Sequence, residues 1–225
     1  MRAPAGRHPI HLACGAALAV VCAIDFYTAR SLSLVAYVQP SLVSLVQPIE
    51  IGLSSVSAGG VAAILISWPF LHREAHRRMT LVVLALQTLG LTLDVVGLVA
   101  STLFGHRANP LYLLLEVALV HASTVLLFTA WYATLDHPSQ LAHARGEPAR
   151  QSFAFPQHSA RYPGYEAWVP GFVDYVSLAF TTSSGLAPAE AMALAASAKL
   201  LTVLQVSISL VILLVLAARA IGLIM

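Results

Sequence analysis

Long apolar segments alternate with short polar ones along this chain, and five of them reach the length of a membrane-spanning helix. A helix needs about twenty mostly apolar residues to cross the hydrocarbon core of a bilayer. The pattern therefore predicts an all-α transmembrane fold with five spanning helices. These run from His11 to Ala29, Ile51 to Leu71, Met79 to Phe104, Leu111 to Leu135 and Ala198 to Ile221.

One further apolar stretch, Ser31 to Gln47, contains Pro40 and is followed by Pro48. Because proline interrupts helical hydrogen bonding, we interpret the stretch as a short interfacial segment or as an extension of the second helix. A sixth span there would invert the orientation of everything before it.

A short apolar segment, Gly171 to Pro188, cannot cross a membrane and contains a cluster of Thr, Ser, Gly and Pro residues. It lies between a polar stretch and the last span, an order that predicts a re-entrant loop. Such backbone is tolerated at membrane depth where protein or a water-filled cavity surrounds it. The alternative is a helix from Gly171 to Thr182 that lies flat at the interface, which the early Asp174 favours.

Composition agrees with a membrane protein, since 58% of residues are hydrophobic and 10% are charged, against roughly 25% charged in soluble domains. The longest polar stretch is poor in Val, Ile and Leu and could not form a separate core. We expect a single membrane domain in three parts. Residues 1–135 hold four spans, 136–168 form a polar cytoplasmic loop, and 169–225 hold the short segment and the last span.

The basic residues predict the orientation, because short cytoplasmic loops carry an excess of Lys and Arg. Eight of them share one side with the N-terminus, which we therefore place in the cytoplasm, with the protein in the plasma membrane. Trp68, Trp131 and Tyr132 then lie where aromatic belts occur. No basic cluster predicts nucleic-acid binding. The eight are Arg2, Arg7, Arg73, Arg77, Arg78, Arg145, Arg150 and Arg161.

Several ionisable or polar side chains fall inside the predicted spans. Asp94, Glu116 and His121 each cost about 3 kcal/mol or more in a membrane unless paired, so they are candidates for proton or cation handling. The alternative is that they pair with neighbours and fix helix packing. Asp25 and Glu50 are expected near the outer interface, without a role. The candidate pore-lining residues are Thr181, Thr182, Ser183, Ser184 and Gly185, with Thr202, Gln205 and Ser209 on the last span.

Two other patterns predict packing or surface features rather than chemistry. Ser55 and Gly59, like Ala58 and Ala62, form a small-residue surface suited to helix packing or oligomerisation. His72, Glu74 and His76 have a spacing that can hold a metal ion, but the sequence is not His-Glu-x-x-His, and we interpret it as a basic turn at the lipid headgroups. No catalytic residue, metal site or cofactor is predicted, and an enzyme is not expected.

Residues Phe172 to Thr182 resemble the pore helix of two-transmembrane potassium channels. Those channels continue with Thr-Val-Gly-Tyr-Gly, whose carbonyls replace the hydration shell of potassium, whereas this chain continues Thr-Ser-Ser-Gly-Leu-Ala-Pro from Thr182. From Trp131 onward the chain resembles a family of uncharacterised bacterial multi-pass membrane proteins with an ion-channel-like segment before the last helix. The residues that carry this resemblance include Trp131-Tyr132, Leu135-Asp136, Phe155-Pro156-Gln157, Trp168, Phe172 to Tyr175 and Ala198-Lys199-Leu200.

The resemblance implies a fold and no assigned activity. We expect a channel-like or transport protein that lacks the potassium selectivity signature, with the lipid bilayer, a small cation and further copies of the chain as its candidate partners. The alternative is a non-transporting scaffold or partner-binding protein that docks through the cytoplasmic loop.

Overall fold

The computed structural model describes residues 10–34, 40–67, 73–104, 110–158, 164–165, 168–185 and 191–222. Within them the chain forms six α-helices, two short strands and one 3₁₀ turn, which confirms the predicted all-α fold. The elements are α1 (Ile10–Leu34), α2 (Pro40–Ser67), α3 (Arg73–Phe104), α4 (Pro110–Ala144), β1 (Phe153–Ala154), η1 (Pro156–His158), α5 (Phe172–Ser184), β2 (Met192–Ala193) and α6 (Ala196–Gly222).

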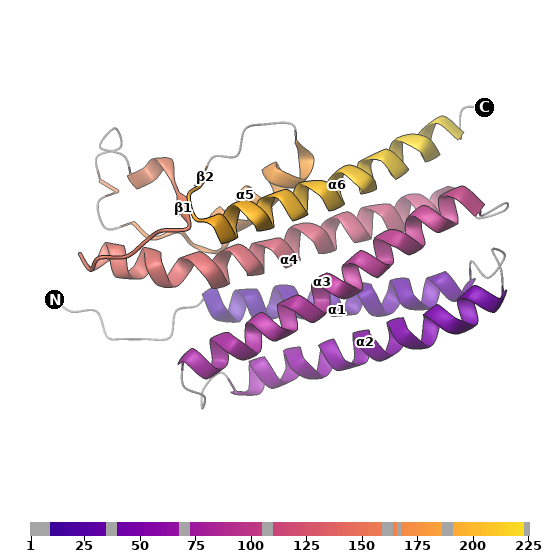
Figure 1. Ribbon diagram of the computed structural model, residues 1–225, viewed down its shortest axis with the longest axis horizontal. Helices are drawn as coiled ribbons and strands as arrows, with labels where there is room; N and C mark the ends of the chain where they lie inside the picture. The colour runs from indigo at the N-terminus through magenta and orange to yellow at the C-terminus, as the bar shows by residue number, and fades with distance from the viewer. Residues whose placement is uncertain are drawn as a thin grey trace.

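Five of these helices, α1, α2, α3, α4 and α6, are long and apolar enough to cross a membrane. They alternate in direction along the bundle, so that the start of α1 and the end of α6 lie at opposite ends of it (Figure 1). The helix α2 begins at Pro40, so part of the uncertain stretch extends the second helix. Residues 35–39 lie outside the described residues, and no sixth spanning helix occurs within the described ranges.

The distribution of apolar and polar side chains is that of a membrane protein. Large apolar side chains face outward, with Ile66 and Leu200 each 71% exposed. Polar side chains such as Gln87, Thr129 and Gln205 are completely buried. Exposed apolar area costs about 25 cal/mol per Å² in water, and a surrounding bilayer removes that cost. The burial pattern therefore supports a multi-pass membrane protein.

Glycines allow two close contacts around α2. A Cβ added to Gly60 would lie 2.6 Å from Cγ2 of Val83 on α3, and a Cβ added to Gly15 on α1 would lie 2.6 Å from Cδ2 of Leu65. The small-residue surface predicted from the sequence lies on another side of α2, away from these two contacts. Gly59 has no atom within 4 Å of an added Cβ, and its neighbours Ser55, Ala58 and Ala62 are exposed. That surface therefore does not pack within the described part of the chain.

The described residues between α4 and α6 include regular secondary structure. The helix α4 continues to Ala144, so the first residues of the segment expected to be a loop are helical. Beyond it, β1 pairs with β2 in antiparallel register, with Phe153 opposite Ala193 and Ala154 opposite Met192. This pairing joins the chain just after α4 to the chain just before α6, and α5 lies between the two strands in the sequence.

Candidate functional site

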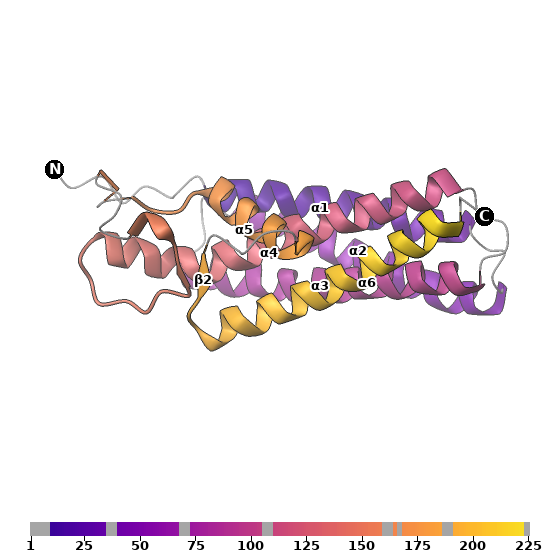
Figure 2. The same cartoon turned by 90° about the horizontal axis from the view of Figure 1, so that it is seen from above.

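The short helix α5 begins at the end of the bundle where α4 ends and α6 begins, and it lies alongside both (Figure 2). The backbone N–H of Gly171 donates to Oδ2 of Asp174 at 2.7 Å, so the carboxylate caps the first turn. Gly185 ends the helix in the left-handed conformation, with φ of 61°, which glycine adopts without steric cost. The capping hydrogen bond therefore explains why a carboxylate occurs at Asp174, in the first turn of α5.

The C-terminal half of α5 is fastened to the bundle by one glutamine. The Nε2 of Gln205 on α6 donates to the carbonyl of Ala179 at 2.7 Å and to Oγ of Ser183 at 2.6 Å. Its Oε1 accepts a hydrogen bond from the hydroxyl of Tyr132 on α4. Gln205 lies nine residues after Ala196, which is about 14 Å along α6 at 1.5 Å per residue. Three helices thus meet at one buried polar contact, the α4–α5–α6 contact.

The other pore-lining candidates divide into two groups. The hydroxyls of Thr182 and Thr202 also interact with the Tyr132 phenol, and Ser209 is buried on α6, one helical turn beyond Gln205. In contrast, the Thr181 hydroxyl donates to the Ser177 carbonyl at 2.9 Å.

The Ser184 hydroxyl likewise donates to the Thr181 carbonyl at 3.2 Å, while Gly185 is exposed. The structure therefore gathers Thr182, Ser183, Thr202 and Gln205. Within a single chain these groups pack against one another.

Tyr132 differs from its sequence prediction. It was expected in an aromatic belt, but it is completely buried, because its hydroxyl serves the α4–α5–α6 contact. Its neighbour Trp131 is half-buried and donates from Nε1 to the Thr88 hydroxyl on α3 at 2.9 Å. Trp68 lies outside the described residues.

A second polar centre at the end of α4 was missed in the sequence. The side chain of Asp136 is completely buried, and its Oδ1 accepts from the backbone N–H groups of Ser152 at 2.7 Å and Phe153 at 3.1 Å. Its Oδ2 accepts from Nε2 of Gln140 at 2.9 Å and from the Tyr175 hydroxyl at 3.0 Å. One carboxylate therefore fixes both β1 and the beginning of α5 to α4. Its only sequence signal was its position in the family resemblance.

Apart from Asp136, four carboxyl side chains are buried among the described residues of α1–α4, one from each helix. Asp94 was predicted inside a span, and Thr28 on α1 donates to its Oδ1 at 3.2 Å. If ionised, Asp94 would be repelled electrostatically by the carboxylates of Asp25, Glu50 and Glu116. We call this set the carboxyl cluster: Asp25, Glu50, Asp94 and Glu116.

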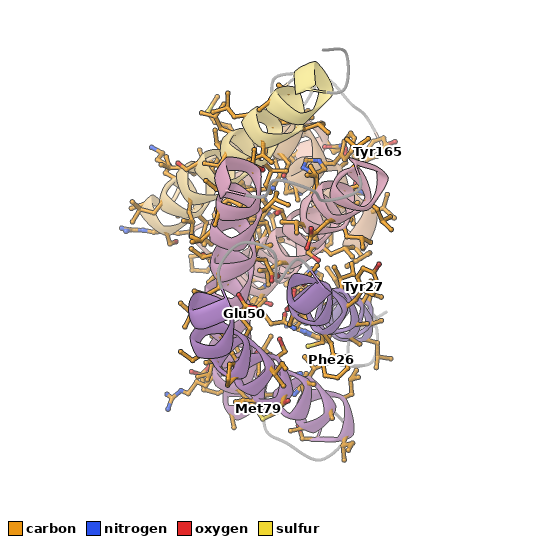
Figure 3. The ribbon with its side chains drawn as sticks, turned by 90° about the vertical axis from the view of Figure 1, so that its right-hand side faces the viewer. Phe26, Tyr27, Glu50, Met79 and Tyr165 are labelled. Carbon is orange, nitrogen blue, oxygen red and sulfur yellow. The ribbon has the colours of Figure 1, made fainter. Side chains whose placement is uncertain are left out.

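Two members of the cluster correct the sequence prediction. Asp25 and Glu50 were expected at the outer interface, where water would solvate them, but both are buried. Figure 3 looks along the bundle from the end where α1 leads toward α2, and Glu50 lies among the helices while Tyr27 and Phe26 lie toward the outside. Hydropathy could not place Asp25 and Glu50, because it does not specify which side of a helix meets its neighbours.

His121 lies on a different side of α4 from Glu116, the member of the cluster on that helix. It follows Glu116 by five residues on α4, which is about 140° around a helix with 3.6 residues per turn. It is half-buried, and its Nδ1 has no hydrogen-bond partner among the described residues. Gln87 lies two turns before Asp94 and instead joins α3 to α1, donating to the Leu18 carbonyl at 3.1 Å.

The possible metal pattern is only partly described, since His72 lies outside the described residues. Glu74 forms an exposed ion pair with Arg78 at 3.2 Å. The His76 ring lies edge-on to His11 on α1, with ring centroids 6.2 Å apart. Within the part of the chain that the structure describes, no three His, Cys, Asp or Glu side chains are arranged to hold a metal ion.

Comparison of the chain with protein-family models, with curated proteins and with solved structures gave no match. The resemblance to a bacterial channel-like family stays a prediction.

Proposed function

We propose that this chain is a channel-like or transport protein of the plasma membrane that moves a small cation, with α5 as a re-entrant helix. The observation that carries the proposal is the α4–α5–α6 contact, in which the polar end of a short helix meets Gln205 about 14 Å along a spanning helix. A helix lying flat as a connector would have no reason to bring its hydroxyl groups to this depth.

The two faces of α5 support its insertion. The buried residues Tyr175, Leu178, Ala179 and Ser183 share one side of the helix and face the bundle. The opposite side carries apolar groups, with Val173 75% exposed and Phe180 54% exposed. Contact of such a face with lipid costs no hydrophobic free energy, whereas contact with water does. The pairing of β1 with β2 keeps both ends of the inserted segment at one end of the bundle.

The orientation and assembly belong to the same proposal. The eight basic residues that accompany the N-terminus favour a cytoplasmic location for it and for both ends of the α5 segment. The exposed small-residue surface around Gly59 on α2 is suited to close helix contact with a second copy, which supports a homo-oligomer.

The first experiment measures cation flux into liposomes that contain the purified full chain. We expect flux down an imposed gradient of protons, Na⁺ or K⁺. Replacing Gln205→Leu should strongly reduce it, because the Ser183 and Tyr132 hydroxyls would lose their partner and α5 its position. Ser207→Ala is the matched control, since the Ser207 side chain is exposed on α6 and bonds to the carbonyl of Val203.

A second experiment tests re-entrance directly. Cys14 and Cys22 are both free and buried, so they are replaced by Ala before single cysteines are introduced at Gly171, Phe180 and Met192. We expect an impermeant thiol reagent to label Gly171→Cys and Met192→Cys from the same side and to spare Phe180→Cys. Equal labelling at all three sites would favour a flat connector, and absence of flux for every ion would favour the scaffold function.

A further inference from the structure

We infer that the carboxyl cluster is a proton-binding site, and that the proton is therefore the cation which this protein handles. The inference names the ion for the proposed transport function and rests on that function for its physiological meaning. Proton binding itself can be measured without any transport.

The geometry places two members of the cluster on facing turns of α1 and α3. Thr28, three residues after Asp25, donates its hydroxyl to Oδ1 of Asp94 at 3.2 Å. Gly90, one turn before Asp94, has Oδ2 of Asp25 3.9 Å from the position of an added Cβ. The absence of a side chain at Gly90 leaves space beside the Asp25 carboxyl. The two aspartates thus face each other across the interface between α1 and α3.

The carboxyl of Asp25 is directed into this interface, and one of its oxygens lacks a hydrogen-bond partner within the described part of the chain. Its side chain is 4% exposed, and Oδ1 has no hydrogen-bond partner among the described residues. A buried carboxylate oxygen without a donor is costly, because it loses its hydration and gains nothing in exchange. A proton on this carboxyl removes the charge and supplies an O–H donor. The site is therefore more stable with a proton bound.

The surrounding groups oppose full ionisation of the cluster. If all four carboxyls were ionised, Asp94 would be repelled by Asp25, by Glu50 from α2 and by Glu116 from α4, and Glu50 would be repelled by Glu116. Cys22 on α1 also interacts electrostatically with Asp25, and its thiolate would add further negative charge. Carboxylates that share a low-dielectric site retain protons, since the charge on one raises the cost of ionising the next.

Three members of the cluster also occupy a common level in the bundle, whereas Glu116 lies six residues after the start of α4, about 9 Å from the same end. Asp25 lies nine residues before the end of α1, Glu50 ten residues after the start of α2, and Asp94 ten residues before the end of α3. Each is thus about 14–15 Å from the same end of the bundle at 1.5 Å per residue. This is the end opposite to the one from which α5 starts. Protons bound here would be held inside the apolar part of the molecule.

Infrared difference spectroscopy on the full chain in lipid nanodiscs tests the site. We expect a protonated carboxyl C=O band that titrates with pH and is lost or shifted in Asp25→Asn and in Asp94→Asn. The control Glu74→Gln removes an exposed carboxylate paired with Arg78 and should leave the band unchanged. If the Asn variants do not fold, Thr28→Val keeps all four carboxyls, removes the donor to Asp94 and should shift the band.

The same samples in vesicles loaded with a pH-sensitive dye report proton flux. A titrating band without proton flux would support the proton site and refute proton transport, and absence of Na⁺ and K⁺ flux as well would refute the transport function. Flux with a spectrum that none of the cluster variants alters, Thr28→Val included, would overturn the site and leave transport standing. A band that disappears on adding Na⁺ or K⁺ at constant pH would overturn the assignment to protons in favour of a metal cation.

Discussion

Asp136 shows how much of this structure can depend on one side chain. An ionised carboxylate is an acceptor at both oxygens, and here the two oxygens receive donors from α4, from the backbone of β1 and from Tyr175 on α5. Alanine or an amide at this position would leave several buried N–H and O–H groups without an acceptor. The residue therefore positions the chain on both sides of the long connection between α4 and α6.

We expect Asp136→Ala to destabilise the protein by about 3 kcal/mol or more, because hydrogen bonds to charged groups contribute about 1.5–3 kcal/mol each. Hydrogen exchange should accelerate at the amides of Ser152 and Phe153. Tyr175→Phe removes a single donor and should cost about 1–2 kcal/mol. Glu147→Ala, at an exposed site, serves as the control, and equal exchange rates in Asp136→Ala and this control would refute the role of Asp136.

At the scale of the elements, α2 and α3 are held close by the absence of a side chain at Gly60. Two adjacent glycines on α2 provide a direct comparison, because Gly60 faces Val83 on α3 whereas Gly59 faces open space within the described residues. Valine is branched at Cβ and has few alternative rotamers. An added methyl group at Gly60 would therefore push the helices apart.

We expect Gly60→Ala to lower stability by about 1 kcal/mol, since overpacking costs about 1–3 kcal/mol and the gain in helix propensity offsets up to about 1 kcal/mol. Gly59→Ala should be neutral or stabilising. Unfolding of both variants in mixed detergent micelles measures the difference. The close packing of α2 on α3 would be contradicted if both substitutions had the same effect.

The elements themselves could largely be predicted from the sequence, because about twenty apolar residues are sufficient evidence for a span. All five predicted spans correspond to helices. Hydropathy does not specify partners across the bundle, however. It gave no reason to bury Asp25 with Asp94 or to join Tyr132 to Gln205, since these contacts depend on how the helices are rotated against one another.

The end of α4 was missed for a related reason. Polarity at Asp136, His137 and Gln140 indicated a loop, but these side chains are buried. The backbone of residues 152–153 folds back over Asp136 and Gln140, and the His137 ring lies edge-on to His11 on α1. Among the pore-lining candidates, Thr182, Ser183, Thr202 and Gln205 lie in one polar region around Tyr132. The hydrogen bond between Gln205 and Ser183 depends on the position of α5, which no periodicity specifies.

At the scale of the whole molecule, an odd number of spanning helices separates the two ends of the chain. The first and last spanning helices start from the same end of the bundle, so α6 ends opposite the start of α1. Combined with the excess of basic residues beside the N-terminus, this arrangement predicts a cytoplasmic N-terminus and a C-terminus on the other side.

Fusions expressed in a bacterial host can check this orientation. A fluorescent protein that folds only in the cytoplasm should be active at the N-terminus, and a phosphatase that is active only outside it should be active at the C-terminus. Activity of the fluorescent fusion at both ends would contradict five spans. Exchanging Arg73, Arg77 and Arg78 together for Gln should weaken the preference, because basic residues in short loops set the orientation.

The pairing of Phe153 with Ala193 and of Ala154 with Met192 has a consequence for how such a protein can change over evolution. It closes the intervening chain at its base, so α4 and α6 stay joined whatever lies between the strands. Lengthening a closed loop is inexpensive, with each doubling adding only about 0.6 kcal/mol. The connections between the strands and α5 can therefore vary in length, provided that Tyr175 and Ser183 keep their hydrogen bonds with Asp136 and Gln205.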